Sequence, residues 1–261
     1  PDRCLDRVGL MRDKPRVTAG EVATRNQIIA TLSVFAVLAG CIALFPATGE
    51  GDATLHFLNA RTGAAGQVPE LLHSRARPLF KLLIIGPAWL GLPYARLALA
   101  ALSAVTAWHT IGLARDLALP RPTLAAFFHI AQPVTFAAAQ DTLTELPAAL
   151  AVLAAMRLWL HGRTQLSCLV ISFTPLLRPE GFFFIAAWAL LTLWSLRKRP
   201  LVTLVAHGAL LAAGLLTWCS STWLLVGDPL FLIHEWRWPA KSYESYGDGG
   251  PFDYLLRNTW F

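Results

Sequence analysis

The chain alternates long apolar blocks with short polar segments. Each block holds roughly 15 to 25 residues, and a helix of about 20 apolar residues crosses the hydrocarbon core of a bilayer. Charged residues make up 15% of the chain, whereas a soluble domain carries about 25%. In lipid, only helices and closed barrels satisfy their backbone hydrogen bonds. The sequence therefore predicts an all-α, polytopic transmembrane helical bundle over residues 27–226.

The blocks predict about seven spans. These spans are residues 27–45, 94–113, 122–139, 146–160, 164–177, 182–196 and 201–226. A long first extracytoplasmic loop, residues 46–92, contains Pro78 and Pro87. Because proline breaks a helix interior, we expect short interfacial helices in this loop. Residues 227–261 are expected to be an extracytoplasmic tail, truncated at the start of a further helix.

The distribution of charge predicts the orientation of the chain. A basic tail, residues 1–26, and the connections 114–121, 157–163 and 197–199 hold most of the arginines of the short segments, and the other connections hold nearly all the clustered acids. By the positive-inside rule, the basic segments and the N-terminus face the cytoplasm. The net charge of +6 lies at the ends of apolar blocks, not in one patch with interleaved aromatic residues, so we expect no nucleic-acid partner.

Two carboxylates, Glu50 and Asp52, directly follow the first span. Asp52 and His56 are four residues apart, so they share one face of a helix. A carboxylate here is a candidate general base for an acceptor hydroxyl. The alternative is that the acids only stabilise a helix N-terminus through its dipole, and spacing alone favours that alternative.

A basic group in the same loop consists of Arg75 and Arg77, with Lys81 beyond them. Arginine binds phosphate in a bidentate manner and keeps its charge, so these side chains form a candidate phosphate site. The alternative is contact with lipid headgroups at the membrane surface.

Two further polar segments are predicted on the extracytoplasmic side. Arg178 and Glu180 interrupt an apolar run; charges at membrane depth are costly and often functional, but Pro179 between them fits an interfacial turn equally well. Thr142 and Glu145 have the spacing of a capping box, so helix capping is their expected role. The two acids Asp141 and Glu145 leave an electrostatic role open.

In their order along the chain, these features resemble the amino-terminal part of the GT-C superfamily of integral-membrane glycosyltransferases. This group includes protein O-mannosyltransferases, lipid-A aminoarabinose transferases and bacterial enzymes of the dolichyl-phosphate-mannose type. The resemblance covers about residues 27–240. It rests on the Glu50-Gly51-Asp52 element, the long outer loop and the Leu-Arg-Pro-Glu-Gly-Phe stretch at 177–182.

The resemblance implies an inverting transfer of a sugar from a polyprenyl-phosphate donor to a lipid, glycan or protein acceptor, in a bacterial inner membrane. It implies that Asp52 is the general base and Glu50 the second acid; some relatives carry two adjacent acids, which leaves the choice between them open. Arg75 or Arg77 would meet the donor phosphate. Arg178 is a weaker candidate for that role; its partner Glu180, and His56 beside Asp52, are further substrate contacts. Members differ in whether a divalent cation takes part, and this sequence leaves that open.

Two other function classes compete with the transferase. A transporter or flippase for a lipid or small anion would use the same outer arginines. It should show repeated halves and ionisable residues near the middle of the membrane, whereas this chain has no detectable repeat and carries its charges at the membrane edge. A non-catalytic, degenerate homologue is the third class. No cysteine or histidine spacing suits zinc.

Overall fold

The computed structural model describes residues 19–45, 51–72 and 77–231, and every regular element in these ranges is a helix. In chain order the elements are α1 (Ala19–Leu44), α2 (Gly51–Ala64), α3 (Pro69–Leu72), α4 (Pro78–Leu90), α5 (Leu92–Asp116), α6 (Leu124–Ala131), α7 (Pro133–Gln140), α8 (Glu145–Leu160), α9 (Thr164–Ser172), the 3₁₀ helix η1 (Thr174–Leu176), α10 (Gly181–Leu196) and α11 (Leu201–Val226). The prediction of an all-α chain is confirmed for the described residues.

Three of the described helices are long and apolar enough to cross a membrane: Val22–Leu44 of α1, α5 and α11. The count rises to four if α7 and α8, bent by 114° at their junction, form one broken span. The predicted spans 27–45, 94–113 and 201–226 correspond to the three long helices. The predicted spans 146–160, 164–177 and 182–196 coincide with α8, with α9 plus η1, and with α10, each of 16 residues or fewer.

The block predicted as one span at 122–139 differs from the prediction. It forms two helices, α6 and α7, of eight residues each. The break is at Gln132, whose backbone is extended with ψ 120°, directly before Pro133. Proline removes a backbone donor and disfavours helical geometry in the residue before it. The apolar composition therefore continues past Gln132 and Pro133, but the helix ends there.

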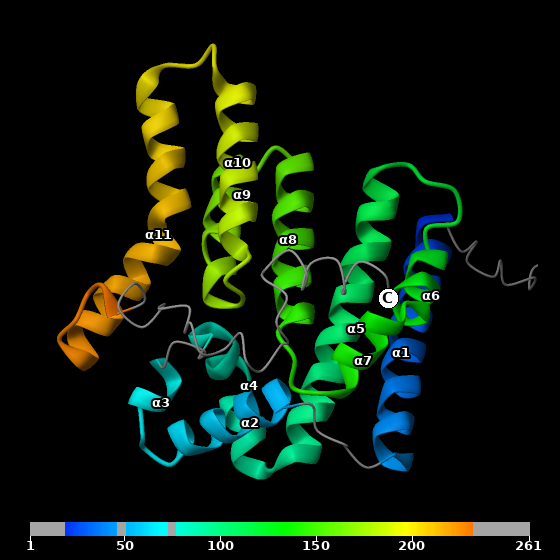
Figure 1. The fold of residues 1–261 in the computed structure, drawn as a ribbon. Coiled ribbons are helices and arrows are strands. Elements are labelled where there is room, and N and C mark those ends of the chain that lie inside the picture. The colour runs from blue at the N-terminus through cyan, green and yellow to red at the C-terminus, as the bar shows by residue number, and fades with distance from the viewer. Residues whose placement is uncertain (1–18, 46–50, 73–76, 232–261) are drawn as a thin grey trace, which may run out of the picture.

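The predicted first loop folds into α2, α3 and α4, which lie together at the lower end of the bundle in Figure 1. Phe57 of α2 and Phe80 and Ile84 of α4 are buried in the same core cluster as Leu99 of α5. This packing attaches the loop helices to a long apolar helix. The three helices form a layer across one end of the bundle.

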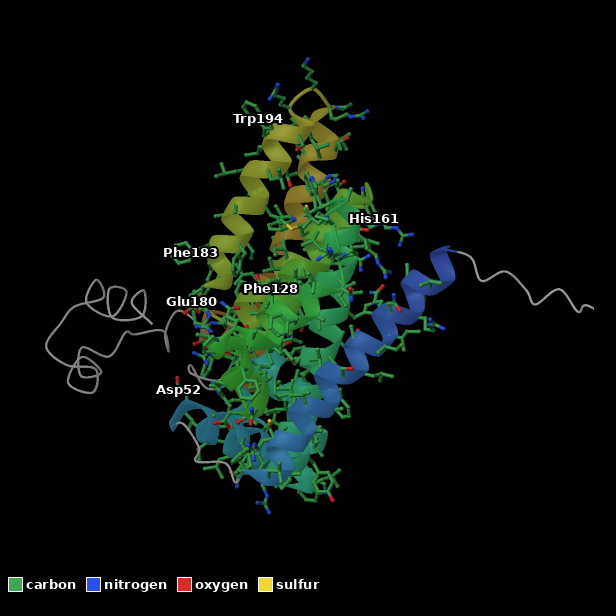
Figure 2. All side chains as sticks on the ribbon, turned by 90° about the vertical axis from the view of Figure 1, so that its right-hand side faces the viewer. Asp52, Phe128, His161, Glu180, Phe183 and Trp194 are labelled. Carbon is green, nitrogen blue, oxygen red and sulfur yellow. The ribbon has the colours of Figure 1, made fainter. Side chains whose placement is uncertain are left out.

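The outer surface of the bundle carries large apolar side chains. Leu224 is 81% exposed, Phe183 77% and Trp194 71%. Figure 2 shows Phe183 and Trp194 on the outside of the bundle, away from the core. A surface of this kind is stable against lipid rather than water, in agreement with the candidate spans.

The connections between helices fall at two ends of the bundle. Those at 117–123, 161–163 and 197–200 lie at the upper ends of the helices in Figure 1, and those at 141–144 and 177–180 lie at the lower ends, toward α2 and α4. At the lower end, Arg96 of α5 donates to the carbonyl oxygens of Gln140 at 2.6 Å and Phe45 at 3.3 Å. This buried arginine fixes the ends of α1 and α7 against α5.

Candidate functional site

Four segments of the chain meet at the lower end of the bundle: α2, the start of α4 and the turns that precede α8 and α10. Their polar side chains form a connected group, which we call the polar cluster: His56, Arg77, Thr144, Glu145, Arg178 and Glu180. Four of these six residues are the substrate contacts predicted from the sequence. Glu145 was considered there for capping or an electrostatic role, and Thr144 was not predicted.

Arg77 lies at the centre of the polar cluster. Its Nη1 donates to Nε2 of His56 at 2.8 Å and to Oγ1 of Thr144 at 3.2 Å. The backbone of Arg77 is left-handed, with φ 45° and ψ 67°, directly before Pro78, the first residue of α4. A residue other than glycine occupies this region at a cost, and such strain often accompanies functional sites. The two hydrogen bonds stabilise the strained residue.

The contact with Arg77 decides the protonation state of His56. Arginine only donates hydrogen bonds, so Nε2 of His56 accepts, and the neutral ring carries its proton on Nδ1. Burial lowers the pKa of His56 to about 3, and the positive charges of Arg77 and Lys81 act in the same direction. His56 is therefore neutral at pH 7. Its Nδ1 is buried and has no hydrogen-bond partner among the described residues, which leaves an unused donor in the cluster.

Arg178 joins the two acids of the cluster. Its guanidinium pairs with Glu145 and makes two hydrogen bonds to Glu180, each of 3.1 Å. Burial alone would raise the pKa of Glu180, but the hydrogen bond from Arg178 and the charges of Arg178 and Arg77 hold it below its usual value. The segment 178–180 is thereby fastened to the start of α8.

The capping box predicted for Thr142 and Glu145 is wrong. Thr144, not Thr142, precedes the first helical residue of α8, and it makes no side-chain cap hydrogen bond. Thr142 is fully buried, and its hydroxyl donates to the carbonyl oxygen of Ala53 at 2.5 Å. The Thr142 hydroxyl therefore bonds to a carbonyl oxygen of α2 and does not cap α8.

Three helix N-termini meet in the polar cluster. Arg77, Thr144 and Glu180 are the N-cap residues of α4, α8 and α10, and none of the three makes a side-chain cap hydrogen bond. The first N–H groups of α10 donate to the carbonyl oxygens of residues 178–180. The helix dipole still gives each of the three N-termini a partial positive charge that favours anions. Glu145 and Glu180, at the starts of α8 and α10, are paired with Arg178, so the charge of Arg77 and the three dipoles leave a positive field that suits a phosphate group.

Lys81 is a buried cation beside the polar cluster. It is 0% exposed, and its Nζ donates to the carbonyl oxygen of Glu70 at 2.7 Å, which ties α4 to α3. Burial lowers the pKa of Lys81 to about 8, against the opposing effect of the Glu70 carboxylate. A lysine inside an apolar segment is the sequence signal for such a contact.

Asp52 lies in the first turn of α2, half-buried, and shares that helix with His56 as predicted. Figure 2 shows Asp52 and Glu180 on the same side of the molecule. Asp52 makes no hydrogen bond or ion pair with any described residue, so its carboxylate is available to a substrate. Its place in the first turn also fits stabilisation of the helix dipole. Glu50 and Arg75 lie outside the described residues.

The two arginines of the cluster differ in their partners. Within the described residues, Arg77 contacts neutral acceptors only, whereas Arg178 is paired with two carboxylates. Arg77 is therefore the better candidate for binding a phosphate. Across these same ranges, no three histidine, cysteine, aspartate or glutamate side chains come together as ligands for a metal ion.

Comparisons of the chain with protein-family models, curated proteins and solved structures find no match. What the chain does is therefore inferred from its own residues and their contacts.

Proposed function

We propose that the chain is a membrane glycosyltransferase that moves a sugar from a polyprenyl-phosphate donor to a lipid, glycan or protein acceptor. The observation that carries this proposal is the convergence of Arg77 and three uncapped helix N-termini in one cluster, on the same side of the molecule as Asp52. Such a field favours a phosphate. The carboxylate of Asp52, which has no partner in the described part of the chain, is the group that can accept a proton from a hydroxyl. The GT-C resemblance points to the same segments.

The proposed topology has seven crossings in a bacterial inner membrane, with the N-terminus in the cytoplasm and the polar cluster on the extracytoplasmic side. A helix of 16 residues, such as α8 or α10, is about 24 Å long. Helices shorter than the hydrocarbon core are accommodated by local thinning of the bilayer. The basic connections at 117–123, 161–163 and 197–200 then share the cytoplasmic end.

The proposed reaction is a single displacement at the anomeric carbon of the sugar. Asp52, or Glu50 in its place, takes the proton of the acceptor hydroxyl, and the acceptor oxygen forms the new bond to the anomeric carbon. The bond from that carbon to the phosphate oxygen of the donor breaks, and the electron pair leaves with the lipid phosphate. Negative charge grows on this phosphate, so a fixed cation and helix dipoles stabilise the transition state. Arg77 supplies the cation.

Arg178 acts differently in this proposal. Its guanidinium is paired with the carboxylates of Glu145 and Glu180. These pairs fix the turn before α10 to the start of α8. That contact keeps two of the helix N-termini in place around the phosphate. Arg178 is a positioning residue, and Arg77 is the substrate contact.

The test uses membranes that contain the protein, labelled polyprenyl-phosphate sugars and an acceptor extract. Loss of a general base lowers a rate by roughly 100- to 10,000-fold, and this is the expected effect of Asp52→Asn if Asp52 is the base. The same loss in Glu50→Gln alone would move the role to Glu50. Arg77→Gln should lower transfer, while Arg61→Gln, which removes an exposed arginine from α2, should leave transfer unchanged.

Two results would count against the enzyme. If no sugar is transferred from any donor while labelled lipid or anion crosses the membrane in an Arg77-dependent way, the protein is a transporter. If neither transfer nor transport is detected in the inserted protein, it is a non-catalytic homologue.

A further inference from the structure

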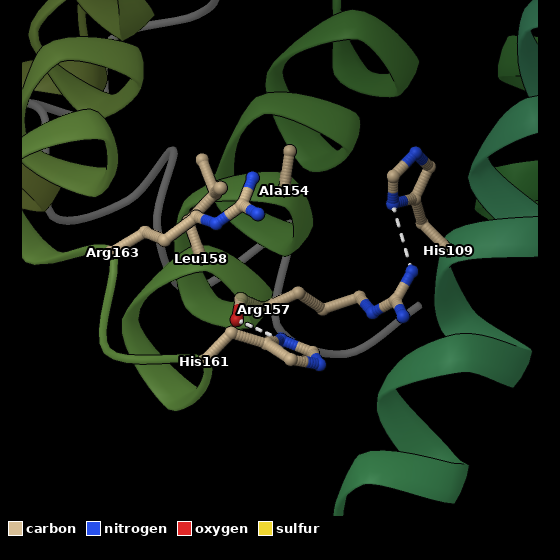
Figure 3. A pocket seen from close by; sticks show the side chains of 6 residues that line it. All are labelled: His109, Ala154, Arg157, Leu158, His161 and Arg163. Carbon is tan, nitrogen blue, oxygen red and sulfur yellow. Dashed lines mark hydrogen bonds between the residues drawn. The ribbon is translucent and has the colours of Figure 1, made fainter.

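A pocket of about 480 Å³ lies at the other end of the bundle from the polar cluster. Figure 3 shows its lining, which comes from α5, α8 and the turn 161–163 between α8 and α9: His109, Ala154, Arg157, Leu158, His161 and Arg163. Four of these side chains are basic and two are apolar. None of them belongs to the polar cluster, so the pocket is independent of the proposed function.

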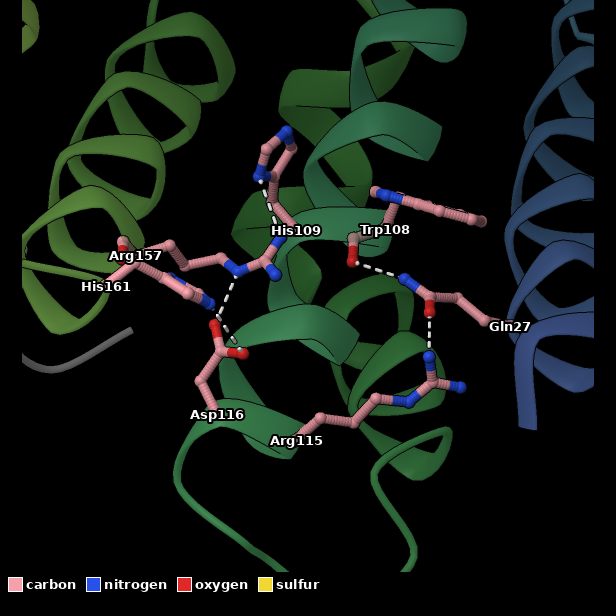
Figure 4. Close-up of polar contacts among 7 residues, drawn as sticks. All are labelled: Gln27, Trp108, His109, Arg115, Asp116, Arg157 and His161. Carbon is pink, nitrogen blue, oxygen red and sulfur yellow. Dashed lines mark hydrogen bonds and ion pairs between the residues drawn. The ribbon is translucent and has the colours of Figure 1, made fainter. Parts of the chain in front are cut away.

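The guanidinium of Arg157 is held against α5 at three points. Its Nε donates to Oδ2 of Asp116 at 2.7 Å, and its Nη1 donates to Nδ1 of His109 at 3.4 Å (Figure 4). The third point is Gly112, where an added Cβ would overlap the guanidinium group. The glycine thus provides the space in which the arginine lies flat on the helix.

These contacts determine which groups face a ligand as donors. Because arginine only donates, Nδ1 of His109 accepts, and its proton lies on Nε2, which has no partner among the described residues. The Nδ1 of His161 lies 2.6 Å from the carbonyl oxygen of Arg157, so it carries a proton that it donates there. The Arg163 side chain is exposed and makes no hydrogen bond or ion pair with the described part of the chain.

The other charged groups near the pocket are already engaged. Asp116 is paired with Arg157 and lies 3.6 Å from Nε2 of His161. Arg115 donates to the side chain of Gln27 and to the backbone of α1, and Gln27 donates to the carbonyl oxygen of Trp108 at 3.1 Å. The contacts of Gln27 with Arg115 and with Trp108, drawn in Figure 4, join α1 to α5. Two arginines against one carboxylate, which Arg157 already pairs, leave the pocket positive.

From this geometry we infer that the pocket binds a phosphate group, carried on the headgroup of an anionic lipid. Arginine donates charge-assisted hydrogen bonds to phosphate and keeps its charge. The guanidinium of Arg163 makes no other hydrogen bond with the described residues, and Arg157 keeps the donors of Nη2, since its Nε and Nη1 already donate to Asp116 and His109. Ala154 and Leu158 supply apolar surface for the glycerol and the first carbons of the chains. Basic pockets between helices at the membrane edge suit lipid headgroups. A free phosphate shares the headgroup chemistry but not the apolar contact.

The test is a binding titration of the protein in non-ionic detergent with three probes: dioctanoyl phosphatidylglycerol, inorganic phosphate and dioctanoylglycerol, which lacks phosphate. Each dissociation constant is measured from the shift in thermal unfolding. Removing a charge-assisted hydrogen bond weakens binding by about tenfold or more, and this is the expected effect of Arg157→Gln and of Arg163→Gln on phosphatidylglycerol. Gly112→Ala should act like Arg157→Gln, since it displaces the guanidinium without removing its charge.

Arg197→Gln is the matched control. Arg197 stacks over Trp194 at 4.2 Å and lies outside the pocket lining. Its loss removes the same charge, so binding should remain unchanged. Weakening in the pocket variants alone supports the inference, and inorganic phosphate that binds as tightly as the lipid identifies the ligand as the free anion. No binding by either phosphate probe, equal binding of dioctanoylglycerol, or an equal loss in Arg197→Gln overturns it.

Discussion

Acidification from pH 7 to pH 5 should destabilise the protein through one buried side chain, His56. Its pKa is lowered from the ordinary 6.5 to about 3 by burial and by the charges of Arg77 and Lys81. Below pH 6.5 the imidazole of His56 binds a proton in the unfolded chain but not in the folded protein. The free energy of unfolding therefore falls as the pH falls toward 3. At about 1.36 kcal/mol per pH unit, the loss by pH 5 amounts to about 2 kcal/mol.

The assay is unfolding by sodium dodecyl sulfate in mixed micelles, followed by tryptophan fluorescence, at both pH values. Trp188 and Trp218 are buried and report loss of the core. The comparison is with His56→Gln, which cannot titrate but can still accept a hydrogen bond from Arg77. Other histidines titrate in both proteins, so the difference between the two isolates His56. The pKa of Glu180 is lowered from 4.5, so its contribution is lost only below that pH.

We expect the free energy of unfolding of the wild type to fall by about 2 kcal/mol more than that of His56→Gln between pH 7 and pH 5. An equal pH dependence in the two proteins would refute the argument, because it would show that His56 is protonated in the folded state without cost.

Three further predictions concern packing, topology and the phosphate contact. Gly214→Ala would place a Cβ against the backbone of α9 and should lower the free energy of unfolding by about 1–3 kcal/mol. Gly208→Ala on the same helix, where a Cβ would meet nothing within 4 Å, should raise it by up to about 1 kcal/mol. The same unfolding titration measures both variants. Gln67→Cys should react with an impermeant maleimide added on the extracytoplasmic side, and Lys198→Cys with the reagent added on the cytoplasmic side. Reaction of both cysteines from the same side would contradict the topology. Arg77→Gln should raise the KM for the lipid donor more than for the acceptor; an equal rise for both argues against a phosphate contact.

The sequence predicted the long helices better than the short ones, for a physical reason. An apolar block indicates that a segment lies in lipid or in a protein core, and this is enough to locate α1, α5 and α11. It does not indicate whether the helical backbone hydrogen bonds continue through the whole block. Pro133 lies inside an apolar block, and the chain breaks into α6 and α7 at the residue before it. The sequence signal for the break is Pro133 itself, and the apolar composition of the block gives no sign of it.

Four of the predicted site residues lie together in the polar cluster, but the contacts between them could not be predicted. His56, Arg77, Arg178 and Glu180 were all named from local patterns, and the structure brings them into one cluster. The bonds that join them are tertiary: Arg77 contacts His56 21 residues away and Thr144 67 residues away. Rules for neighbours on one helix reach only three or four residues. The same limit explains the wrong capping box at Thr142, whose partner is in another helix.

The position of the polar cluster follows from where a helix in lipid can carry charge. Charged groups in the middle of a span are costly, and five of the six cluster residues lie at or beside the start of a helix. Pro78 and Pro179 help to define these starts, because neither residue can continue a helix from the preceding turn. The breaks that begin α4, α8 and α10 also place the positive ends of three helix dipoles at the same end of the bundle. These dipoles make that end attractive to an anion, so the interruptions in the spans and the proposed phosphate site have one physical origin.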